Sequence, residues 1–472
     1  MSPRRETSTI DEPIVGGPEP DPQETFLFVV LHCDDPLGGG ARYGLADIDR
    51  VAIGRGDDRI AKRDPDQRRL ELYLPSPYVS SRHAELRRSA RGWRVYDQGS
   101  RNGTYINGER VEEGPLRDGD VLQVGQTLLR LRTYLPAADD LDTAPADRTH
   151  PQPTEIGLTT LLPDLAARLA RLPSIASSSV PVLLLGESGT GKEVLARVIH
   201  ELSERSGALV SVNCGSLSET LLESQLFGHR KGAFTGATHD EPGFARAAHQ
   251  GTLFLDEIGD LPEPAQAAFL RLLQEGEVVP VGSTRPQKVD LRVVAATHRP
   301  LEHMAKTGAF RSDLLARLSG YRHELVPLRD RREDLGLLVG TILRRLCRPA
   351  TEVPRIEPEV GRLLVQYAWP LNIRELEQCL ASAVALAQGD MILSAHLPPQ
   401  IREASPRHRP PPRRQGSQQD LRQTLITLLE QYEGNVTQVA RRLGKARNQI
   451  HRWLDRYQIE PNAYRKRSPK EG

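Results

Sequence analysis

The stretch VPVLLLGESGTGKE, residues 180–193, decides the fold of the central part of this 472-residue chain. An apolar run ends in a glycine-rich turn, and KEVLARVIHELSE then continues with the spacing of a helix. A strand, a glycine-rich turn and a helix in this order form a phosphate-binding loop, because the glycines let backbone N–H groups surround phosphate oxygens and the helix N-terminus favours negative charge. The stretch therefore predicts a nucleotide site in an α/β domain with a largely parallel sheet.

We expect the residues of this loop to bind ATP. They are Gly186, Glu187, Ser188, Gly189, Thr190, Gly191, Lys192 and Glu193. Lys192 is placed to reach the β- and γ-phosphates, whereas Glu193 replaces the Ser or Thr that usually helps to hold the metal. The alternative is a glycine-rich turn that arose by chance, which does not account for the strand, the lysine and the helix around it.

A second apolar run, LFLDE at residues 253–257, ends in two carboxylates. Asp256 is suited to coordinate Mg²⁺, and Glu257 is suited to polarise an attacking water. A purely structural role would leave two acids unpaired at the end of a buried strand, which is energetically costly. The two motifs together predict an ATPase that uses ATP and Mg²⁺.

Composition limits the class of protein. Charged residues make up 26% of the chain and hydrophobic residues 38%, as in globular proteins. The sequence contains no apolar run near the roughly 20 residues of a membrane helix and no apolar core of a secretory signal near its start. We therefore expect a cytoplasmic protein without a membrane segment. The cysteines form no CxxC pair and are expected to be reduced and buried. They are Cys33, Cys214, Cys347 and Cys379.

The positive charge is concentrated at one end. Residues 402–472 carry 16 Lys and Arg against 7 Asp and Glu, a net charge of +9, so the rest of the chain carries −8 of the overall +1. A basic end on an acidic chain indicates a polyanionic partner for that end.

Changes in composition divide the chain into seven parts, and the fold class expected is multidomain. The parts are a polar tail (1–24), a β-sandwich of short strands (25–134), a linker (135–154), an α/β P-loop domain with a helical lid (155–396), a Pro/Arg-rich linker (397–416), an all-α segment (417–460) and a basic tail (461–472).

Residues 155–396 resemble the AAA+ activators of sigma-54 RNA polymerase. The segments GESGTGKE, ESQLFGHRKGAFTGA, GTLFLDEIGDLP, FRSDLLARL and WPLNIREL stand in the order of that family. The resemblance implies a ring, usually a hexamer, with ATP bound between subunits. It implies that Arg311 and Arg317 are arginine fingers acting on a neighbouring subunit, that Arg374 is a second-sensor arginine, and that Asn213 pairs with Glu257 as a switch. For Arg311, a surface salt bridge is the alternative.

Four positions bear on this resemblance. His298 stands where the family commonly has Asn in its first sensor, and Leu371 replaces a usual Gly in the turn before the last lid motif. Ile156 and Gly157 match the family's adenine-side contact over a short segment.

The KGAFTGA segment matches the loop with which that family contacts sigma-54. The contact residues implied are Gly232, Ala233, Phe234, Thr235, Gly236 and Ala237. An aromatic side chain on a glycine-hinged loop suits a transient apolar contact with a partner. The implied partner is the sigma-54 RNA polymerase holoenzyme. The alternative is a loop that packs on its own domain.

Residues 26–133 resemble a forkhead-associated (FHA) domain through the segments VAIGRG, SPYVSSRHAEL and DQGSRNGTYINGERV. The resemblance implies that loops at one end of the sandwich bind phosphothreonine, with His83 and Gly54 shaping the loops. Arginines and a hydroxyl on loops suit a phosphate. The alternative is a sandwich that no longer binds phosphate. The implied phosphopeptide-binding residues are Arg55, Ser80, Arg82, Arg101 and Asn102. The ligand would be a phosphothreonine protein or the chain's own tail, phosphorylated at Thr7 or Thr9.

The segment LITLLEQYEGNVTQVARRLGKARNQIHRWLDRYQI resembles a Fis-type helix-turn-helix. Its third helix presents side chains that can read base edges or contact phosphates in upstream DNA. These are Arg447, Asn448, Gln449, His451 and Arg452. A helical dimerisation bundle is the alternative, and both can hold because such operators are usually bound by dimers.

The parts together predict an ATP-dependent activator of sigma-54 transcription. It would bind upstream DNA, form a homo-oligomer from dimer to hexameric ring, and remodel the closed promoter complex under control of phosphothreonine recognition. One alternative is an FHA-containing AAA+ scaffold that remodels a different protein. Another is a phosphopeptide-binding adaptor with an inactive ATPase.

Overall fold

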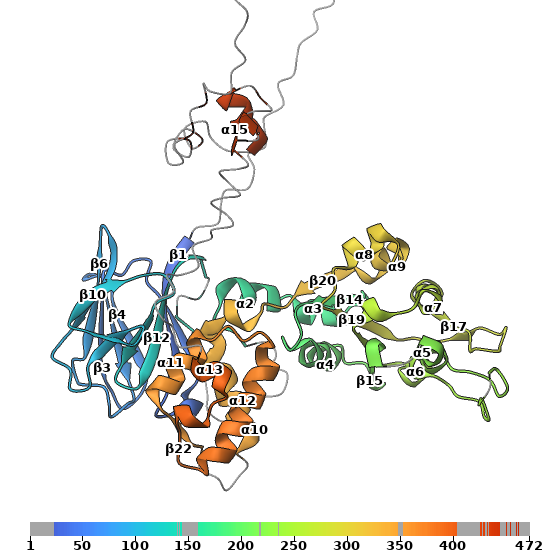
Figure 1. The fold of residues 1–472 in the computed structure, drawn as a ribbon, viewed down its shortest axis with the longest axis horizontal. Coiled ribbons are helices and arrows are strands. Elements are labelled where there is room, and N and C mark those ends of the chain that lie inside the picture. The colour runs from blue at the N-terminus through green and yellow to red at the C-terminus, as the bar shows by residue number, and fades with distance from the viewer. Residues whose placement is uncertain are drawn as a thin grey trace, which may run out of the picture. The chain divides into compact units, whose positions relative to one another are not determined.

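The computed structural model describes residues 23–138, 140, 142–143, 159–216, 219–234, 236–347 and 353–403, together with separate positions between 425 and 461. The chain divides into two compact units, Met1–Ser405 and Pro406–Gly472, and each is described by itself. The first unit contains a β-sandwich, a parallel α/β core and a helical lid (Figure 1). This arrangement confirms the expected multidomain fold class.

The β-sandwich consists of two sheets packed face to face. Its elements are β1 (Gln23–His32), η1 (Pro36–Gly38, a 3₁₀ helix), β2 (Ala41–Gly44), β3 (Arg50–Arg55), β4 (Ile60–Asp64), β5 (Arg69–Leu74), β6 (Ala84–Ser89), β7 (Gly92–Asp97), β8 (Thr104–Ile106), β9 (Glu109–Val111), β10 (Glu113–Leu116), β11 (Val121–Val124), β12 (Thr127–Pro136) and β13 (Asp142–Thr143). One sheet has the order β13-β2-β1-β12-β11-β8-β9 and the other β10-β7-β6-β3-β5-β4. Strand β13 lies in the span expected to be a linker, where it pairs with β2.

Strand β1 is buried on both of its faces. Leu27 and Val29 pack in the core between the two sheets. Phe26, Phe28 and Val30 instead belong to a cluster that contains residues of the helical lid. Alternate residues of a strand face opposite sides, so this sheet has a core on each side.

The α/β core contains a five-stranded sheet in the order β15-β16-β19-β14-β20, with all neighbouring strands parallel. Its elements are α2 (Pro163–Leu169), α3 (Leu172–Ala176), β14 (Val182–Leu185), α4 (Lys192–Leu202), β15 (Leu209–Asn213), η2 (Cys214–Ser216), α5 (Glu219–Phe227), α6 (Phe244–Ala247), β16 (Thr252–Asp256), η3 (Ile258–Asp260), α7 (Glu263–Glu275), β17 (Glu277–Val278), β18 (Gln287–Lys288), β19 (Arg292–Thr297), α8 (Leu301–Thr307), α9 (Ser312–Leu318) and β20 (Tyr321–Glu324). The ends of β14 and β16 therefore meet at one edge of the sheet, where the two sequence motifs come together.

The helical lid follows the last core strand. Its elements are η4 (Leu328–Asp330), η5 (Arg332–Asp334), α10 (Leu335–Leu346), β21 (Arg355–Ile356), α11 (Pro358–Gln366), α12 (Asn372–Ala387), β22 (Met391–Ile392), η6 (Ser394–His396) and α13 (Pro399–Glu403). The helical lid expected from the sequence is confirmed, with a short parallel pair of β21 and β22 added. Helix α13 lies past residue 396, where the sequence analysis ended this domain.

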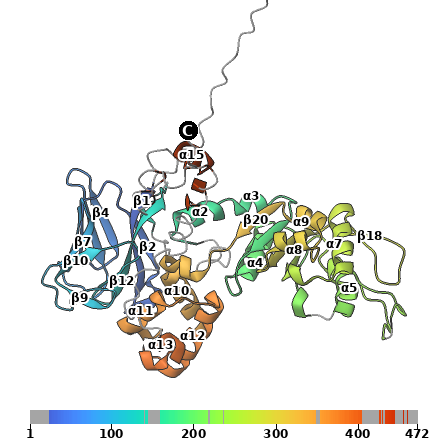
Figure 2. The same ribbon diagram turned by 45° about the horizontal axis from the view of Figure 1, so that its top comes forward.

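Lid helices α10 and α11 lie beside strands β1 and β12 of the sandwich, as both ribbon views show (Figures 1 and 2). A Cβ atom added at Gly336 of α10 would lie 2.1 Å from the carbonyl oxygen of Val30. One added at Gly361 of α11 would lie 2.6 Å from Sγ of Cys33. Real side chains are not accommodated at such distances, so the sandwich and the lid approach each other more closely than other residues would permit.

In the second unit, helix α15 (Val436–Leu443) and the other described positions share one apolar cluster. Its buried members are Leu425, Leu429, Val436, Val439, Ile450, Leu454 and Ile459. This shared apolar core agrees with the all-α segment expected there. Arg447, Asn448, Gln449, His451 and Arg452 lie outside the described residues.

All four cysteines are free and buried, as the sequence predicted. Within the part of the chain that the structure describes, we find no helix with the length and apolar character needed to cross a bilayer.

Candidate functional site

The phosphate-binding loop connects β14 to α4, and two of its glycines have backbone angles that favour glycine. Gly189 has φ 76° and Gly191, the N-cap of α4, has φ 102°. A Cβ atom at Gly189 would lie 2.1 Å from the carbonyl oxygen of Leu371, so the lid backbone also requires glycine there. The loop sequence thus sets both the turn and its contact with the lid.

The Lys192 side chain folds back inside this loop. Its Nζ donates hydrogen bonds to the carbonyl oxygens of Gly186, at 2.9 Å, and Glu187, at 3.2 Å, and lies 3.8 Å from Oε1 of Glu257. Burial lowers the pKa of Lys192, while the Glu257 and Asp256 carboxylates oppose this effect. A buried ammonium held by carbonyls and acids is suited to bind phosphate oxygens.

The acid pair lies at the end of β16, beside the lysine. Burial, followed by the neighbouring Glu257, raises the pKa of Asp256, whereas Lys192 opposes the rise. A half-buried carboxylate of this kind gains most from a divalent cation. The described residues contain no group of three or more His, Cys, Asp or Glu that could hold a metal ion. The donor set therefore fits Mg²⁺ held by one carboxylate together with nucleotide phosphates and water.

Glu257 is held by a histidine. Its Oε2 lies 2.8 Å from Nδ1 of His298, and the hydroxyl of Thr297 donates to the same oxygen at 3.4 Å. Glu257 also has φ 53°, a left-handed angle that costs a non-glycine residue about 1–3 kcal/mol and is typical of functional positions. His298, which replaces the usual Asn of the first sensor, thus contacts Glu257 directly, a contact that its sequence position did not predict.

Asn213 does not make the expected contact with Glu257. Strand register places Asn213 opposite Asp256, but its Oδ1 accepts a hydrogen bond from the backbone N–H of Gly215 at 3.0 Å. The Glu257 carboxylate is engaged by Lys192 and His298 instead. The switch pairing therefore stays a prediction, and Asn213 lines the same cavity as Glu257.

The lid contacts the phosphate loop through residues at the start of α12. Nη1 of Arg374 donates to Oγ of Ser188 at 3.2 Å, and Nδ2 of Asn372 donates to the Ser188 carbonyl at 2.9 Å. Asn372 and Trp369 have the positive φ angles of this turn, 56° and 50°, whereas Leu371 has φ −104°. The turn therefore accepts leucine where the resembled family has glycine.

Two arginines of the lid also hold the loop, and the sequence analysis missed both. The guanidinium of Arg329 binds both carboxylate oxygens of Glu187, at 2.5 and 2.7 Å, and this hydrogen bonding lowers the pKa of Glu187 to about 2. Arg331 donates to the carbonyl oxygen of Thr190 at 3.1 Å. The sequence RDRR at residues 329–332 matches no motif that would have identified Arg329 and Arg331 as contacts of the phosphate loop.

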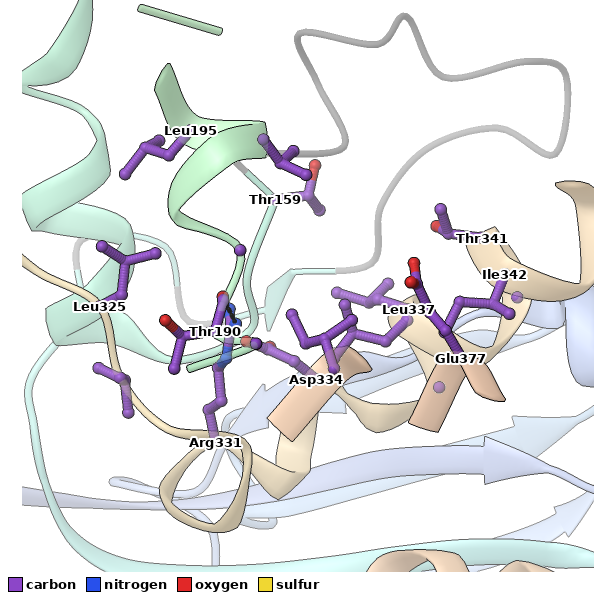
Figure 3. Close-up of a pocket in the computed structure, with 18 of the residues that line it drawn as sticks. Thr159, Thr190, Leu195, Leu325, Arg331, Asp334, Leu337, Thr341, Ile342 and Glu377 are labelled. Atoms are coloured by element: carbon purple, nitrogen blue, oxygen red, sulfur yellow. Dashed lines mark hydrogen bonds between the residues drawn. The ribbon is translucent and has the colours of Figure 1, made fainter. Parts of the chain in front are cut away.

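The phosphate loop, the acid pair, Arg331 and Arg374 line a cavity of about 890 Å³. In Figure 3, the Arg331 side chain points towards Thr190, Asp334 and Leu337 lie beside them, and Glu377 lies farther along the lid. The cavity is lined by the P-loop, the acid pair, lid helices and residues of the sandwich. The lining includes Lys192, the Asp256 and Glu257 pair and several arginines, which suits a nucleoside triphosphate.

Arg311 and Arg317 are not among the described residues that line this cavity. Arg311 forms an ion pair with Asp313, with Nη2 and Oδ2 2.8 Å apart, at the N-terminus of α9. Arg317 lies exposed in the last turn of the same helix. Within one chain, Arg311 thus makes the surface salt bridge considered as its alternative role.

The KGAFTGA segment projects from the α/β core between α5 and α6, at the same end as the β17–β18 hairpin (Figure 1). Phe234 is 37% exposed, and its ring centroid lies 4.9 Å from that of His229. No atom would come within 4 Å of a Cβ added at Gly232 or Gly236, so both glycines border open space. Thr235 lies outside the described residues.

The expected phosphopeptide-binding residues gather at one end of the sandwich. The backbone N–H of Arg55 donates to the carbonyl of Ser80 at 3.0 Å, and Oγ of Ser80 accepts from the backbone N–H of Arg101 at 3.1 Å. Asn102 donates to the Tyr78 carbonyl at 2.7 Å, and Arg82 is exposed on the adjoining loop.

His83 connects these loops through both of its ring nitrogens. Its Nδ1 accepts a hydrogen bond from the Ser80 backbone N–H at 3.0 Å, and its Nε2 lies 3.1 Å from the Gly103 carbonyl oxygen. The predicted loop-shaping role of His83 is confirmed. A Cβ atom at Gly54 would lie 2.2 Å from the Ser81 carbonyl oxygen, which supports the same role for Gly54.

Comparison with known proteins agrees with this geometry. Residues 160–323 match the sigma-54 interaction domain, and residues 329–414 match the AAA+ ATPase lid domain. The chain is 42% identical over 312 residues to the transcriptional regulatory protein ZraR of Escherichia coli, covering 64% of this chain and 69% of ZraR. The chain belongs to the sigma-54-dependent activators.

Within this activator, residues 51–125 match the FHA domain and residues 417–462 match a homeodomain-like domain. The regulatory protein AtoC of Escherichia coli is 43% identical over 297 residues, with 61% of this chain and 64% of AtoC covered. The chain thus spans somewhat under two thirds of AtoC. A crystal structure of NtrX from Brucella abortus aligns with a TM-score of 0.48 at 29% identity, covering 65% of this chain and 70% of NtrX.

Proposed function

We propose that this sigma-54-dependent activator hydrolyses ATP and uses the energy to remodel the closed promoter complex of sigma-54 RNA polymerase. The observation that carries the proposal is the presence of two features in one α/β core. Lys192, Asp256 and Glu257 line a nucleotide cavity, and Phe234 stands half-exposed on a glycine-bordered loop. An ATPase without a mechanical role has no need for the second feature.

The chemistry follows from the contacts of Glu257. Phosphate oxygens carry more negative charge than one carboxylate, so bound ATP draws the Lys192 ammonium towards the γ-phosphate. Glu257 then remains held by His298, 2.8 Å away, and orients the attacking water. Asp256 would hold Mg²⁺, which supplies charge stabilisation for the departing phosphates.

Completion of the site requires a second subunit. Arg311 and Arg317 are exposed and lie away from the cavity of their own chain, at the N-cap and in the last turn of α9. A guanidinium supplied by a neighbour stabilises charge on the transferring phosphoryl group. We therefore assign the active form to a homo-oligomeric ring, usually a hexamer in the family, that assembles from dimers in the cytoplasm.

The remaining parts supply location and control. The basic segment of the second unit that includes Arg447 and Arg452 would bind upstream DNA. The loops around Arg55 and Ser80 would bind a phosphothreonine protein, or the chain's own tail phosphorylated at Thr7 or Thr9. Thr7, Thr9 and the two DNA-binding arginines lie outside the described residues.

A trapping experiment tests this function. Purified protein is incubated with ADP and aluminium fluoride, which imitates the transition state of hydrolysis, and sigma-54 is added. Wild type should retain sigma-54, whereas Lys192→Ala should lose both nucleotide and sigma-54. Thr235→Ala should keep ATP hydrolysis and lose sigma-54. Hydrolysis by a wild type that never retains sigma-54 would favour the alternative, a remodelling scaffold for a different protein.

A further inference from the structure

One side of the nucleotide cavity is formed by the FHA sandwich. The segment between β1 and β2, residues 34–40, is called the coupling loop here. It contributes Asp35, Leu37, Gly38 and Gly39 to the lining of the cavity that also contains Lys192. The next FHA loop contributes Asp58 and Arg59. A cavity wall that comes from the sensory domain makes nucleotide binding sensitive to that domain's position.

The lid holds the coupling loop in place. Nη2 of Arg344, on α10, donates a hydrogen bond to the carbonyl oxygen of Leu37 at 3.0 Å. A Cβ atom at Gly340, one turn earlier on α10, would lie 3.2 Å from the Pro36 carbonyl oxygen. Helix α10 also lines the cavity through Leu337 and Thr341 (Figure 3). The coupling loop and the lid therefore border the cavity as one packed layer.

The expected phosphate-binding loops hold the coupling loop from the other side. Nη1 of Arg59 donates to the carbonyl oxygens of Gly38, at 3.2 Å, and Gly39, at 3.3 Å. Oγ of Ser76, a buried residue, donates to Oδ2 of Asp34 at 2.5 Å. Arg59 follows Arg55 on one loop, and Ser76 precedes Ser80 on the other. Two of the three loops expected to contact phosphate thus also contact the coupling loop.

We propose that the coupling loop is a shared element of the two binding sites, through which phosphothreonine binding changes the affinity for nucleotide. The inference rests on the proposed phosphothreonine and ATP binding. Closure of the Arg55 and Ser80 loops on a phosphate shifts Arg59 and Ser76, and the coupling loop moves with them. Because coupling between two binding equilibria is reciprocal, nucleotide must change phosphopeptide affinity by the same factor.

The test is a pair of titrations on the full-length protein. A fluorescent ADP analogue is titrated with and without a saturating pool of peptides that carry one central phosphothreonine between degenerate positions. The same peptide pool is then titrated with and without ADP, and an unphosphorylated pool is the control. Wild type should show a change in dissociation constant of at least about fivefold, equal in both titrations, as allosteric coupling typically gives.

Two variants separate coupling from binding. Ser76→Ala removes the contact with Asp34 without touching the cavity lining, and should leave each single-ligand dissociation constant within about twofold while the coupling factor falls below about two. Ser89→Ala is the matched control, because its hydroxyl bonds the Gly92 carbonyl at the opposite end of β6. Arg59→Ala should also lose the coupling. Because Arg59 lines the cavity, this variant should in addition bind nucleotide alone with a different affinity from wild type.

The outcomes are distinct. A wild type that binds both ligands without mutual effect overturns the inference, and so does a Ser76→Ala variant that couples as wild type does. Failure of wild type to bind the phosphorylated pool, or to bind the ADP analogue, would appear in the single-ligand titrations. Such a failure removes the proposed function itself and the coupling with it.

Discussion

Glu333 offers a direct test of whether the FHA sandwich and the lid form one packed body. Its side chain is completely buried, and Oε1 lies 2.5 Å from Nη1 of Arg132 and 3.5 Å from Nη1 of Arg130. Both arginines come from β12 of the sandwich and are themselves only 22% and 13% exposed. Glu333→Ala therefore leaves two largely buried guanidinium groups without their shared carboxylate.

The cost can be estimated from these contacts. Removing one partner of a buried ion pair destabilises a protein by about 3–5 kcal/mol. Arg132 retains Asp118, 3.3 Å away, so we expect a value near the lower end, about 3 kcal/mol. For a folding unit of roughly 150–250 residues, this corresponds to a fall in melting temperature of about 6–12 °C. Hydrogen exchange should also accelerate in β12 and η5.

Glu113→Ala is the matched control for this measurement. Glu113 pairs with Arg94 at 3.2 Å on the same sandwich, but the two side chains are 59% and 39% exposed. Exposed pairs contribute about 0–1 kcal/mol. Thermal unfolding followed by circular dichroism compares the two variants. Equal shifts for Glu333→Ala and Glu113→Ala would refute the reasoning, because they would show that the buried triad does not hold the two parts together.

Four further outcomes are expected. Glu257→Gln should lower kcat for ATP about 10²–10⁴-fold with nucleotide binding retained, measured by phosphate release, and unchanged kcat would exclude its role with water. Arg55→Ala should abolish binding of a phosphothreonine peptide pool, and equal affinity for wild type and variant would refute the FHA site. Arg452→Ala should reduce the slope of log K against log salt by about 1 in gel shifts, and an unchanged slope would count against DNA contact. Burial raises the pKa of Asp334 to about 6, so its protonated form adds stability that is complete below about pH 4 and is lost as pH rises through about 6. In Asp334→Asn, the free energy of unfolding measured with urea should no longer show this dependence on pH. A variant whose stability varies with pH as that of wild type does would contradict the role of Asp334.

The nucleotide site was largely predictable from sequence because its determinants are local. Gly189, Gly191 and Lys192 occupy one turn, and Asp256 and Glu257 are adjacent on one strand. Parallel strands then bring the two motifs to one edge of the sheet. The FHA loops were equally local, since each candidate residue lies in a turn between short strands.

The contacts between sandwich and lid were not predictable in the same way. Arg132 and Glu333 are 201 residues apart, and neither sits in a motif. One signal was present: FLFVVLH in β1 is apolar at successive positions, which indicates a strand buried on both faces. The pattern alone does not identify the lid helices that cover the outer face of this strand. Gly336 and Gly361 gave no signal, since a glycine inside a helix indicates close packing only once its neighbour is known.

The position of His298 shows a different limit. Its contact with Glu257 depends on the left-handed backbone at Glu257, which turns the carboxylate towards the end of β19. No periodicity or spacing encodes that angle. A family resemblance likewise assigned the partner of Glu257 to Asn213, whereas the local geometry gives it to His298.

Promoter opening by the purified protein is the measurement that tests the central claim most directly. Wild type is mixed with ATP, sigma-54 holoenzyme and a sigma-54 promoter that carries an upstream binding site, and permanganate reactivity of the DNA reports melted thymines. We predict that wild type melts the promoter only with hydrolysable ATP. Thr235→Ala should hydrolyse ATP at the normal rate and melt no promoter DNA. Melting that proceeds without hydrolysis, or hydrolysis that never melts such a promoter, would contradict the account.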